Sequence, residues 1–321
     1  MHSQVTVAAN FDASLRIMGV DRIQGRTMSY RSGFRSGLFD GHTVFVPGGG
    51  GGLGRCIAHE LASLGATVVL AGRTLAKLER TRAEILADGG RVAGCHEVEL
   101  RDEAAVVELV SSVLREAGPL HGLVNAAGGQ FPARLENLSL NAWNAVLNNN
   151  LTSYFLVARE VYRQCMRERG GSIVNIGADY ANGMPGMGHN GAARAGLANF
   201  TATAATEWGR DGVRVNCVIP GFISTPGLDR YPPQDHRALA DVPGKIPLGR
   251  HGMAAEVSSV VVFLLSEMAA YVTGAEFRAD GGAHNGAASF LFRPGEARNI
   301  QIFNGFHRDE AAKLLQRGEG Q

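Results

Sequence analysis

The sequence has few cysteines, no long apolar run and no excess of either charge. Its four cysteines are scattered over 321 residues without a Cys-x-x-Cys pair, which argues against a disulfide framework or a zinc site and is typical of a reduced cytosolic protein. No apolar run approaches the roughly 20 residues that a membrane-spanning helix needs. The net charge of +1 gives no reason to expect nucleic-acid or anionic-membrane partners. We therefore expect a cytoplasmic protein with no such partner and no metal site.

The first 40 residues lack the apolar core of a signal peptide. They contain several arginines but also Asp12 and Asp21, whereas transit peptides are poor in acidic residues. We therefore expect residues 1–40 to form a surface arm or an oligomer contact rather than a targeting segment.

The most informative stretch is glycine-rich, at residues 47–54. It follows an apolar run at 43–46 and precedes a helix-like run at 55–62. Glycines permit positive φ and close backbone approach, and the N-terminus of the next helix favours an anion. A flexible linker is the alternative, but a linker would not join a strand directly to a helix. The pattern predicts a dinucleotide phosphate site formed by Gly48, Gly52, Leu53 and Gly54.

Strand-like and helix-like segments alternate along the rest of the chain. The strands are apolar throughout, which predicts a parallel sheet covered on both faces, a doubly wound Rossmann-type α/β fold of about seven strands. We expect one domain over residues 41–283 and a C-terminal extension over 284–321. The expected strands are 43–46, 67–71, 91–100, 120–125, 172–176, 213–219 and 276–279. The expected helices after the glycine turn are 75–87, 102–117, 141–169, 190–208, 254–266 and a short charged one at 308–316.

Arg73 directly follows the second expected strand. In this fold that position lies near the adenosine ribose. An acidic residue there would accept a hydrogen bond from the 2′-hydroxyl, whereas a guanidinium pairs with a 2′-phosphate. The sequence therefore favours NADP(H) over NAD(H), and an ordinary surface arginine is the alternative.

Several motifs together resemble the short-chain dehydrogenase/reductase superfamily over residues 41–282. They are the glycine spacing, Asn-Ala-Ala-Gly at 125–128, Asn150 in Asn-Leu-Thr, and Pro-Gly at 220–221. Pro47 departs from the usual threonine. Stretches at 125–131, 170–176, 191–196 and 256–266 are most similar to enoyl-CoA and 2,4-dienoyl-CoA reductases, peroxisomal trans-2-enoyl-CoA reductase among them. The resemblance implies further cofactor contacts from Asn125, Ala126, Gly128, Arg194, Pro220, Gly221 and Thr225.

The resemblance fails at the catalytic triad. Most of the superfamily has a serine followed by Tyr-x-x-x-Lys, and these positions here are Ala178, Asn190 and Arg194. Alanine and asparagine cannot exchange a proton near neutral pH, and arginine stays charged. Carbonyl–alcohol interconversion by that triad is therefore not available to this chain.

Enoyl-CoA-type reductases tolerate this loss, because hydride addition to a conjugated thioester develops an enolate that mainly needs hydrogen-bond donors. By resemblance to dienoyl-CoA reductases, Tyr180 is the candidate proton donor. The alternatives are that Tyr180 only packs on its loop, or that Asp179 or His189 is the acid.

Asn150 and Arg194 complete the catalytic set that the resemblance implies, together with Asn190 at the tyrosine position. Asn150 would bind water or the substrate oxygen, or else form a polar contact between helices. Arg194 is expected to point into the same cleft and to bond the ribose hydroxyls in place of lysine.

A segment rich in proline and glycine at 222–250 matches the substrate lid of the superfamily. Met184, Met187, Phe222 and Leu228 are candidate lining residues for an acyl chain, with ordinary packing as the alternative. We expect the extension at 284–321 either to cover the active site of a neighbouring subunit or to fray. The resemblance also implies a homotetramer, the assembly that the superfamily favours.

These observations predict an NADPH-dependent reductase of an activated carbon–carbon double bond, acting on an enoyl-CoA, a 2,4-dienoyl-CoA or a similar small thioester. Two alternatives stay open. One is a ketone or alcohol oxidoreductase with an atypical proton donor, and the other is a non-catalytic NADP(H)-binding protein.

Overall fold

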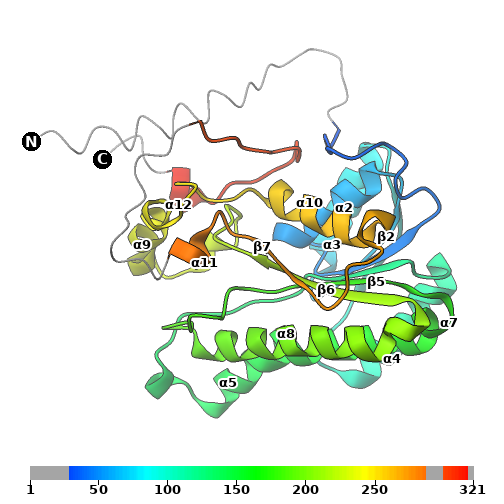
Figure 1. Cartoon of the computed structure of the whole chain (residues 1–321), viewed down its shortest axis with the longest axis horizontal. Coiled ribbons are helices and arrows are strands. Elements are labelled where there is room, and N and C mark those ends of the chain that lie inside the picture. Colours follow the sequence, from blue (N-terminus) through cyan, green and yellow to red (C-terminus); the bar gives the residue numbers. More distant parts are fainter. Residues whose placement is uncertain (1–28, 287–298, 317–321) are drawn as a thin grey trace, which may run out of the picture.

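The computed structural model describes residues 29–286 and 299–316. Within them lies a seven-stranded parallel sheet of order β3-β2-β1-β4-β5-β6-β7 (Figure 1). This confirms the predicted doubly wound sheet, whose ligand site is expected where the order reverses, between β1 and β4. The strands are β1 (Thr43–Pro47), β2 (Thr67–Gly72), β3 (Arg91–Glu97), β4 (Gly122–Asn125), β5 (Gly171–Ile176), β6 (Val213–Pro220) and β7 (Glu276–Ala279).

Helices cover both faces of the sheet and bury two apolar clusters against it. One layer, drawn above the sheet in Figure 1, contains α2 (Gly52–Ser63), α3 (Leu75–Ala87) and α10 (Ala254–Leu265). The other contains α4 (Glu103–Ala117) and α8 (Gly188–Trp208). The helix predicted at 75–87 is confirmed, and Asp102 caps α4 by accepting a hydrogen bond from Ala105 N at 3.1 Å.

The single helix predicted at 141–169 is a helical run interrupted by two π-helical stretches. It comprises α5 (Leu140–Leu147), η2 (Asn148–Thr152), α6 (Ser153–Val161), η3 (Tyr162–Met166) and α7 (Arg167–Arg169). π-Helical turns often occur at functional sites, and Asn150 lies in the first one.

Short helices form most of the expected lid and the remaining connections. The lid contains η5 (Leu228–Arg230), η6 (Pro233–Asp235), α9 (His236–Ala240) and η7 (Val242–Lys245). The other short elements are η1 (Leu135–Asn137), η4 (Gly209–Asp211), η8 (Glu267–Ala269), α11 (Ala283–Gly286) and α12 (Lys313–Gln316). Among the described helices none has the length and apolar character to cross a bilayer.

The described parts of both terminal extensions pack on the layer of α2 and α10. Tyr30 and Phe306 are buried in the same apolar cluster, and Arg31 N donates to Gly305 O at 2.9 Å. The predicted arm therefore belongs to the folded body from residue 29 onward, while residues 1–28 lie outside the described residues. The helix predicted at 308–316 is wrong except for α12, because side-chain contacts hold Arg308 and Glu310 against α2 and α3.

Candidate active site

The glycine turn between β1 and α2 leaves an open cradle at the carboxyl edge of the sheet. A Cβ at Gly48 would lie 2.4 Å from Ala127 N, and one at Gly54 would lie 2.3 Å from Gly48 O. By contrast, a Cβ at Gly51 or Gly52 would meet nothing within 4 Å. Gly51 provides no side-chain cap for α2, so the first N–H groups of the helix are available to an anion. The turn is therefore ordered and the linker interpretation is wrong, while phosphate binding at this cradle stays a prediction.

The end of β4 closes the other side of this cradle. A Cβ on Gly48 would also lie 2.5 Å from the carbonyl carbon of Ala126, so only glycine allows this approach. Asn125 is buried, and its side chain donates to Asn175 Oδ1 at 2.9 Å. Asn125 therefore ties β4 to β5, and its side chain does not face the cradle.

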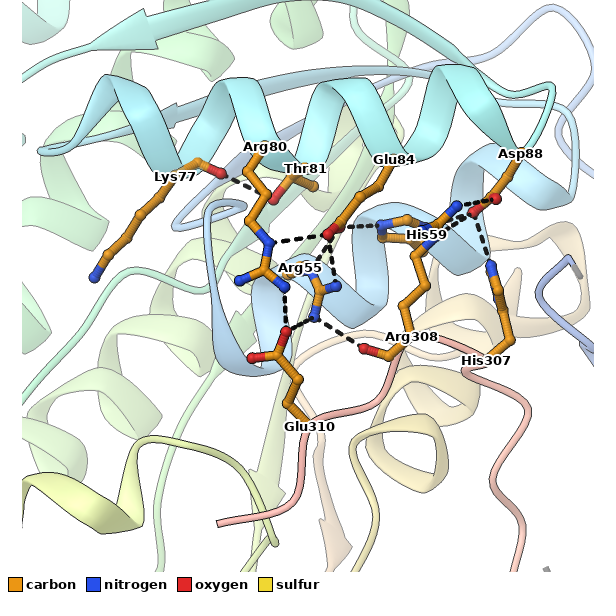
Figure 2. Close-up of polar contacts among 10 residues, drawn as sticks. All are labelled: Arg55, His59, Lys77, Arg80, Thr81, Glu84, Asp88, His307, Arg308 and Glu310. Carbon is orange, nitrogen blue, oxygen red and sulfur yellow. Dashed lines mark hydrogen bonds and ion pairs between the residues drawn. The ribbon is translucent and has the colours of Figure 1, made fainter. Parts of the chain in front are cut away.

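Two cations flank the cradle at the start of α3. Arg73 follows β2 and is exposed, as is Lys77 on the first turn of α3. A Cβ on Gly50 would lie 3.1 Å from Lys77 Cβ, and the Lys77 ammonium points away from the neighbouring acidic side chains (Figure 2). Lys77 was not predicted from the sequence, although its position four residues after Arg73 could have indicated it. Both side chains are positively charged and exposed, as an anion-binding role requires.

Asn150 and Arg194 meet in the buried centre of the site. Arg194 Nη2 donates to Asn150 Oδ1 at 2.8 Å, and Nη1 donates to Ile176 O at 2.9 Å. Asn150 Nδ2 donates to Gly129 O at 2.8 Å and Val146 O at 2.9 Å, and Oδ1 also accepts from Gly129 N at 3.2 Å. The amide has thus used its full hydrogen-bonding capacity. The structure favours the interpretation of Asn150 as a polar contact between elements rather than a substrate ligand.

Two small or aromatic residues shape the pocket around the guanidinium. A Cβ on Gly128 would lie 2.9 Å from Asn150 Oδ1 and 3.0 Å from Arg194 Nη2. Tyr154 lies under the guanidinium, with 5.4 Å between the ring centroid and Cζ. Its hydroxyl donates to Ile176 O at 3.2 Å. Sequence reasoning missed Tyr154, because an aromatic residue on a helix is most often a core residue.

Asn190 lies one helical turn before Arg194 on α8, and both are buried. Its Nδ2 donates only to Met184 Sδ, at 3.3 Å, and its Oδ1 has no partner among the described residues. Arg194 Nε also lacks a partner in the described part of the chain. Buried polar groups without partners are rare and call for an explanation. Arg194 Nε carries an N–H that is free to donate to a substrate oxygen, whereas the unpartnered Asn190 Oδ1 is an acceptor.

Tyr180 does not lie with this group. Its hydroxyl donates to Glu276 Oε1 on β7 at 2.7 Å. Burial, followed by the contact with Glu276, raises the pKa of Tyr180 to about 12. Among the described residues no hydrogen bond joins Tyr180 to Asn150, Asn190 or Arg194, and its role as proton donor stays a prediction.

The other two candidate acids lie in different surroundings. Asp179 pairs with Arg278 at 2.9 Å and with His284 at 3.1 Å. Burial alone would raise the pKa of Asp179, but the hydrogen bonds from these partners outweigh it and lower the pKa. His189 is fully buried and its ring lies 4.8 Å from that of Phe131. Neither of its ring nitrogens has a partner in the described chain, and burial lowers its pKa.

Tyr231 joins the segment expected to form the lid to the loop after β4 and to the N-terminus of α8. Its hydroxyl accepts from Gln130 Nε2 at 3.1 Å and lies 3.7 Å from Met187 Sδ. Met187 therefore lies between α8 and the expected lid, as a lining role requires, whereas Met184 contacts Asn190 Nδ2 through its Sδ at 3.3 Å. Phe222 lies apart from them and lines a groove with Pro247, Leu248 and Arg278.

The remaining predicted cofactor positions lie where the lid leaves the sheet. Pro220 ends β6, and a Cβ on Gly221 would lie 2.7 Å from Asp280 Cα. Thr225 and Leu228 are half-buried at the start of the lid, where Leu228 N donates to Thr225 O at 3.0 Å.

Comparisons with known proteins agree with this geometry. A family model described as "Enoyl-(Acyl carrier protein) reductase" matches residues 49–284. A Bacillus subtilis protein named "Probable 2,4-dienoyl-CoA reductase [(2E)-enoyl-CoA-producing]" is 34% identical, covering 74% of this chain and 95% of the relative. The peroxisomal 2,4-dienoyl-CoA reductase [(3E)-enoyl-CoA-producing] of Pongo abelii is 34% identical, covering 87% and 94%.

A solved structure is more similar in sequence. It is the citronellol catabolism dehydrogenase (AtuB) of Pseudomonas aeruginosa PAO1, 52% identical, with a TM-score of 0.71 and coverage of 79% of this chain and 99% of that chain. Members of this group are oxidoreductases that bind nicotinamide cofactors. The chain therefore belongs to the short-chain dehydrogenase/reductase superfamily, in the family described as enoyl-(acyl carrier protein) reductase.

Proposed function

We propose that the protein uses NADPH to reduce a carbon–carbon double bond conjugated to an acyl thioester. The observation that carries this proposal is the pair Asn190 and Arg194. Arg194 Nε has an unpartnered N–H, and the NH2 group of Asn190 has one hydrogen beyond its contact with Met184 Sδ, at the place where the superfamily has a proton-exchanging tyrosine and a lysine. Such a site suits a reaction that develops negative charge on oxygen without protonating it.

The nicotinamide supplies the hydride when it is bound. Arg194 and Asn190 donate hydrogen bonds to the thioester oxygen as it takes on enolate character. Asn150 and Ile176 O fix the guanidinium through contacts of 2.8 and 2.9 Å, so these donors are in place before the reaction begins, which is where such stabilisation is most effective.

Proton addition at carbon needs a separate donor. Tyr180 serves only if its hydroxyl leaves Glu276, whereas His189 already lies beside the cleft residue Phe131. Tyr180→Phe and His189→Gln distinguish the two. The variant of the true donor loses turnover by orders of magnitude while it still binds NADPH, and the other variant keeps its turnover.

The preference for NADPH is supported by Arg73 and Lys77, which place two cations beside the cradle. Their charge would pair with a 2′-phosphate. The double variant Arg73→Ser/Lys77→Ser should weaken NADPH binding and leave NADH binding nearly unchanged. If the double variant weakened the binding of NADPH and NADH equally, Arg73 and Lys77 would not form the 2′-phosphate site.

The acyl-CoA substrate class is supported by the names of the relatives, two of which are 2,4-dienoyl-CoA reductases. The direct test follows NADPH absorbance with trans-2-enoyl-CoA and 2,4-dienoyl-CoA esters, with a 3-ketoacyl-CoA as control. Consumption with the unsaturated esters alone supports the proposal. Consumption with the 3-ketoacyl ester alone would select a carbonyl reductase with an atypical acid, and tight binding without turnover would select a binding protein.

A second candidate is a dehydrogenase acting in citronellol catabolism. The 52% identity to a solved structure of that name favours it. The missing triad argues against direct alcohol oxidation, because no residue at the tyrosine position can accept the hydroxyl proton. Reduction of NAD(P)⁺ by citronellol with the purified protein would establish this candidate and overturn the first.

We also propose a cytoplasmic homotetramer, as the superfamily resemblance implies. An apolar spot on the long helices supports association, because Phe155 is 39% exposed and its ring lies 6.0 Å from that of the half-buried Phe200. Light scattering of the purified protein gives the mass of the assembly, and Phe155→Glu should reduce it.

A further inference from the structure

The C-terminal segment at residues 301–316, here called the strap, crosses from the lid to the nucleotide-binding half and back to the lid. It runs as a dark red trace over the layer that contains α2, α3 and α10 and ends beside α9 (Figure 1). Four of its hydrogen bonds join it to residues that lie 51, 84, 220 and 253 positions away in sequence.

The middle of the strap is anchored by charged side chains on α2 and α3 (Figure 2). Arg308 donates to both oxygens of Asp88, at 2.6 and 2.9 Å. Glu310 pairs with Arg80 and lies 3.6 Å from Arg55. Arg55 Nη1 donates to the Arg308 carbonyl at 3.1 Å. Arg55 directly follows Gly54, so the anchor lies immediately behind the phosphate cradle.

The anchor is close to charge balance and is partly buried. The anchor consists of three guanidinium groups and the three carboxylates that they face. These groups belong to Arg55, Arg80, Arg308, Glu84, Asp88 and Glu310. Burial alone would raise the pKa of Glu84, but hydrogen bonds from Arg55 and its neighbours outweigh it and lower the pKa to about 2. Arg55 and Glu84 are 8% and 13% exposed in their side chains, which makes this pair less subject to screening than a surface pair.

Apolar contacts hold the same stretch down. Phe306 is 3% exposed and lies under the Arg55 guanidinium, with 5.1 Å from ring centroid to Cζ. Its ring also lies 4.9 Å from His59 and 5.7 Å from Tyr30. Ala312, between the anchor and the lid, is fully buried.

Both ends of the strap are attached to the lid region. Asp229 in η5 accepts from the backbone N–H groups of Lys313 and Leu314, at 3.0 Å each. At the other end of the lid, Arg250 Nη2 donates to Gln301 O at 2.9 Å, and Glu256 Oε1 accepts from Phe303 N at 3.3 Å. The strap therefore joins the two ends of the lid to the helix that starts at the glycine turn.

We propose that Asp229 is a positioning residue that holds the lid closed over the dinucleotide by binding it to the anchored strap. The lid cannot move away from the cradle unless Asp229 releases Lys313 and Leu314 or the anchor opens. The strap therefore slows the release of a bound dinucleotide, in addition to the lid contacts that Tyr231 makes with Gln130 and Met187. This inference rests on the proposed dinucleotide site and is independent of the substrate.

Asp229→Ala is the decisive variant, because it removes both acceptors without touching the cradle or the anchor. Asp241→Ala is the matched control, since Asp241 is an exposed lid aspartate that lies 4.0 Å from Arg237. Two hydrogen bonds to a carboxylate are lost, so NADPH release followed by stopped-flow fluorescence should accelerate about tenfold in Asp229→Ala. The control should match the wild type.

Trypsin cleavage after Arg308 in the ligand-free protein gives a second readout that needs no cofactor. Cleavage should be faster in Asp229→Ala and in Glu310→Gln, a milder variant that keeps the side-chain shape, and unchanged in Asp241→Ala. Wild-type release and cleavage rates in Asp229→Ala would overturn the proposal. Altered cleavage with no dinucleotide binding in any form would instead reject the dinucleotide site and leave the strap attachment supported.

Discussion

Replacing Asn190 by alanine separates catalysis from stability. The Asn190 amide makes one weak hydrogen bond, to Met184 Sδ, and its oxygen has no partner among the described residues. Removing an unsatisfied buried polar group offsets the small cavity that alanine leaves. We therefore expect the free energy of unfolding to change by less than about 1 kcal/mol, which corresponds to a shift in Tm of roughly 3 °C or less.

Turnover should respond much more strongly. If Asn190 Nδ2 donates to the developing enolate, its loss resembles the removal of one donor from an oxyanion hole, which lowers kcat by about 100-fold to 1,000-fold. The substrate KM should change little, because this interaction strengthens mainly in the transition state.

The assay compares kcat, KM and Tm of Asn190→Ala with those of the wild type and of Asn182→Ala. Asn182 is an exposed asparagine on the loop that precedes α8, so its variant controls for the substitution itself. Wild-type kcat in Asn190→Ala, together with an unchanged Tm, would refute the assignment of this amide to the reaction.

Three further substitutions test other parts of the account. Burial lowers the pKa of His59 to about 4, so protonation of this side chain destabilises the folded state as the pH falls below about 6.5. Between pH 7.5 and pH 5 the wild type should therefore lose about 2 kcal/mol of unfolding free energy that His59→Gln keeps. The Tm of the variant should accordingly change less with pH than that of the wild type. Gly54→Ala places a Cβ 2.3 Å from Gly48 O and should lower the Tm sharply. Gly51→Ala is the control, because a Cβ there meets nothing within 4 Å, and it should fold normally. Equal Tm values in the two variants would contradict the packing argument. Arg194→Met removes one donor from Asn150 Oδ1 and the guanidinium contact of Ile176 O. The free energy of unfolding, measured by chemical denaturation, should fall by about 3 kcal/mol, and Arg194→Lys should restore part of it. An unchanged free energy in the methionine variant would mean that these contacts do not stabilise the fold.

The sheet and most of its helices could be predicted because local pattern and burial agree. β1 and β2 are apolar along their length because both faces of the sheet are covered. The π-helical turn at Asn148–Thr152 could not be predicted. Asn150 in this turn donates to Gly129 O, 21 positions earlier in the chain, and no local propensity specifies such a contact.

The site could be predicted in part for the same reason. The spacing of Asn190 and Arg194 places them one turn apart on any helix, so sequence alone located them. Tyr180 lies on a loop, and its contact with Glu276 depends on a residue 96 positions away. The strap was missed because Arg308 meets Asp88 across 220 positions, and the charged pattern at 308–316 fits a solvated helix equally well.

The most direct test of the proposed reaction uses NADPH carrying deuterium at the transferable position, with a 2,4-dienoyl-CoA ester as substrate. We predict that mass spectrometry and NMR of the product will find the deuterium on a carbon of the former diene, with the thioester carbonyl intact. Deuterium on a carbinol carbon from a ketone or aldehyde substrate, with none transferred to the diene, would contradict double-bond reduction.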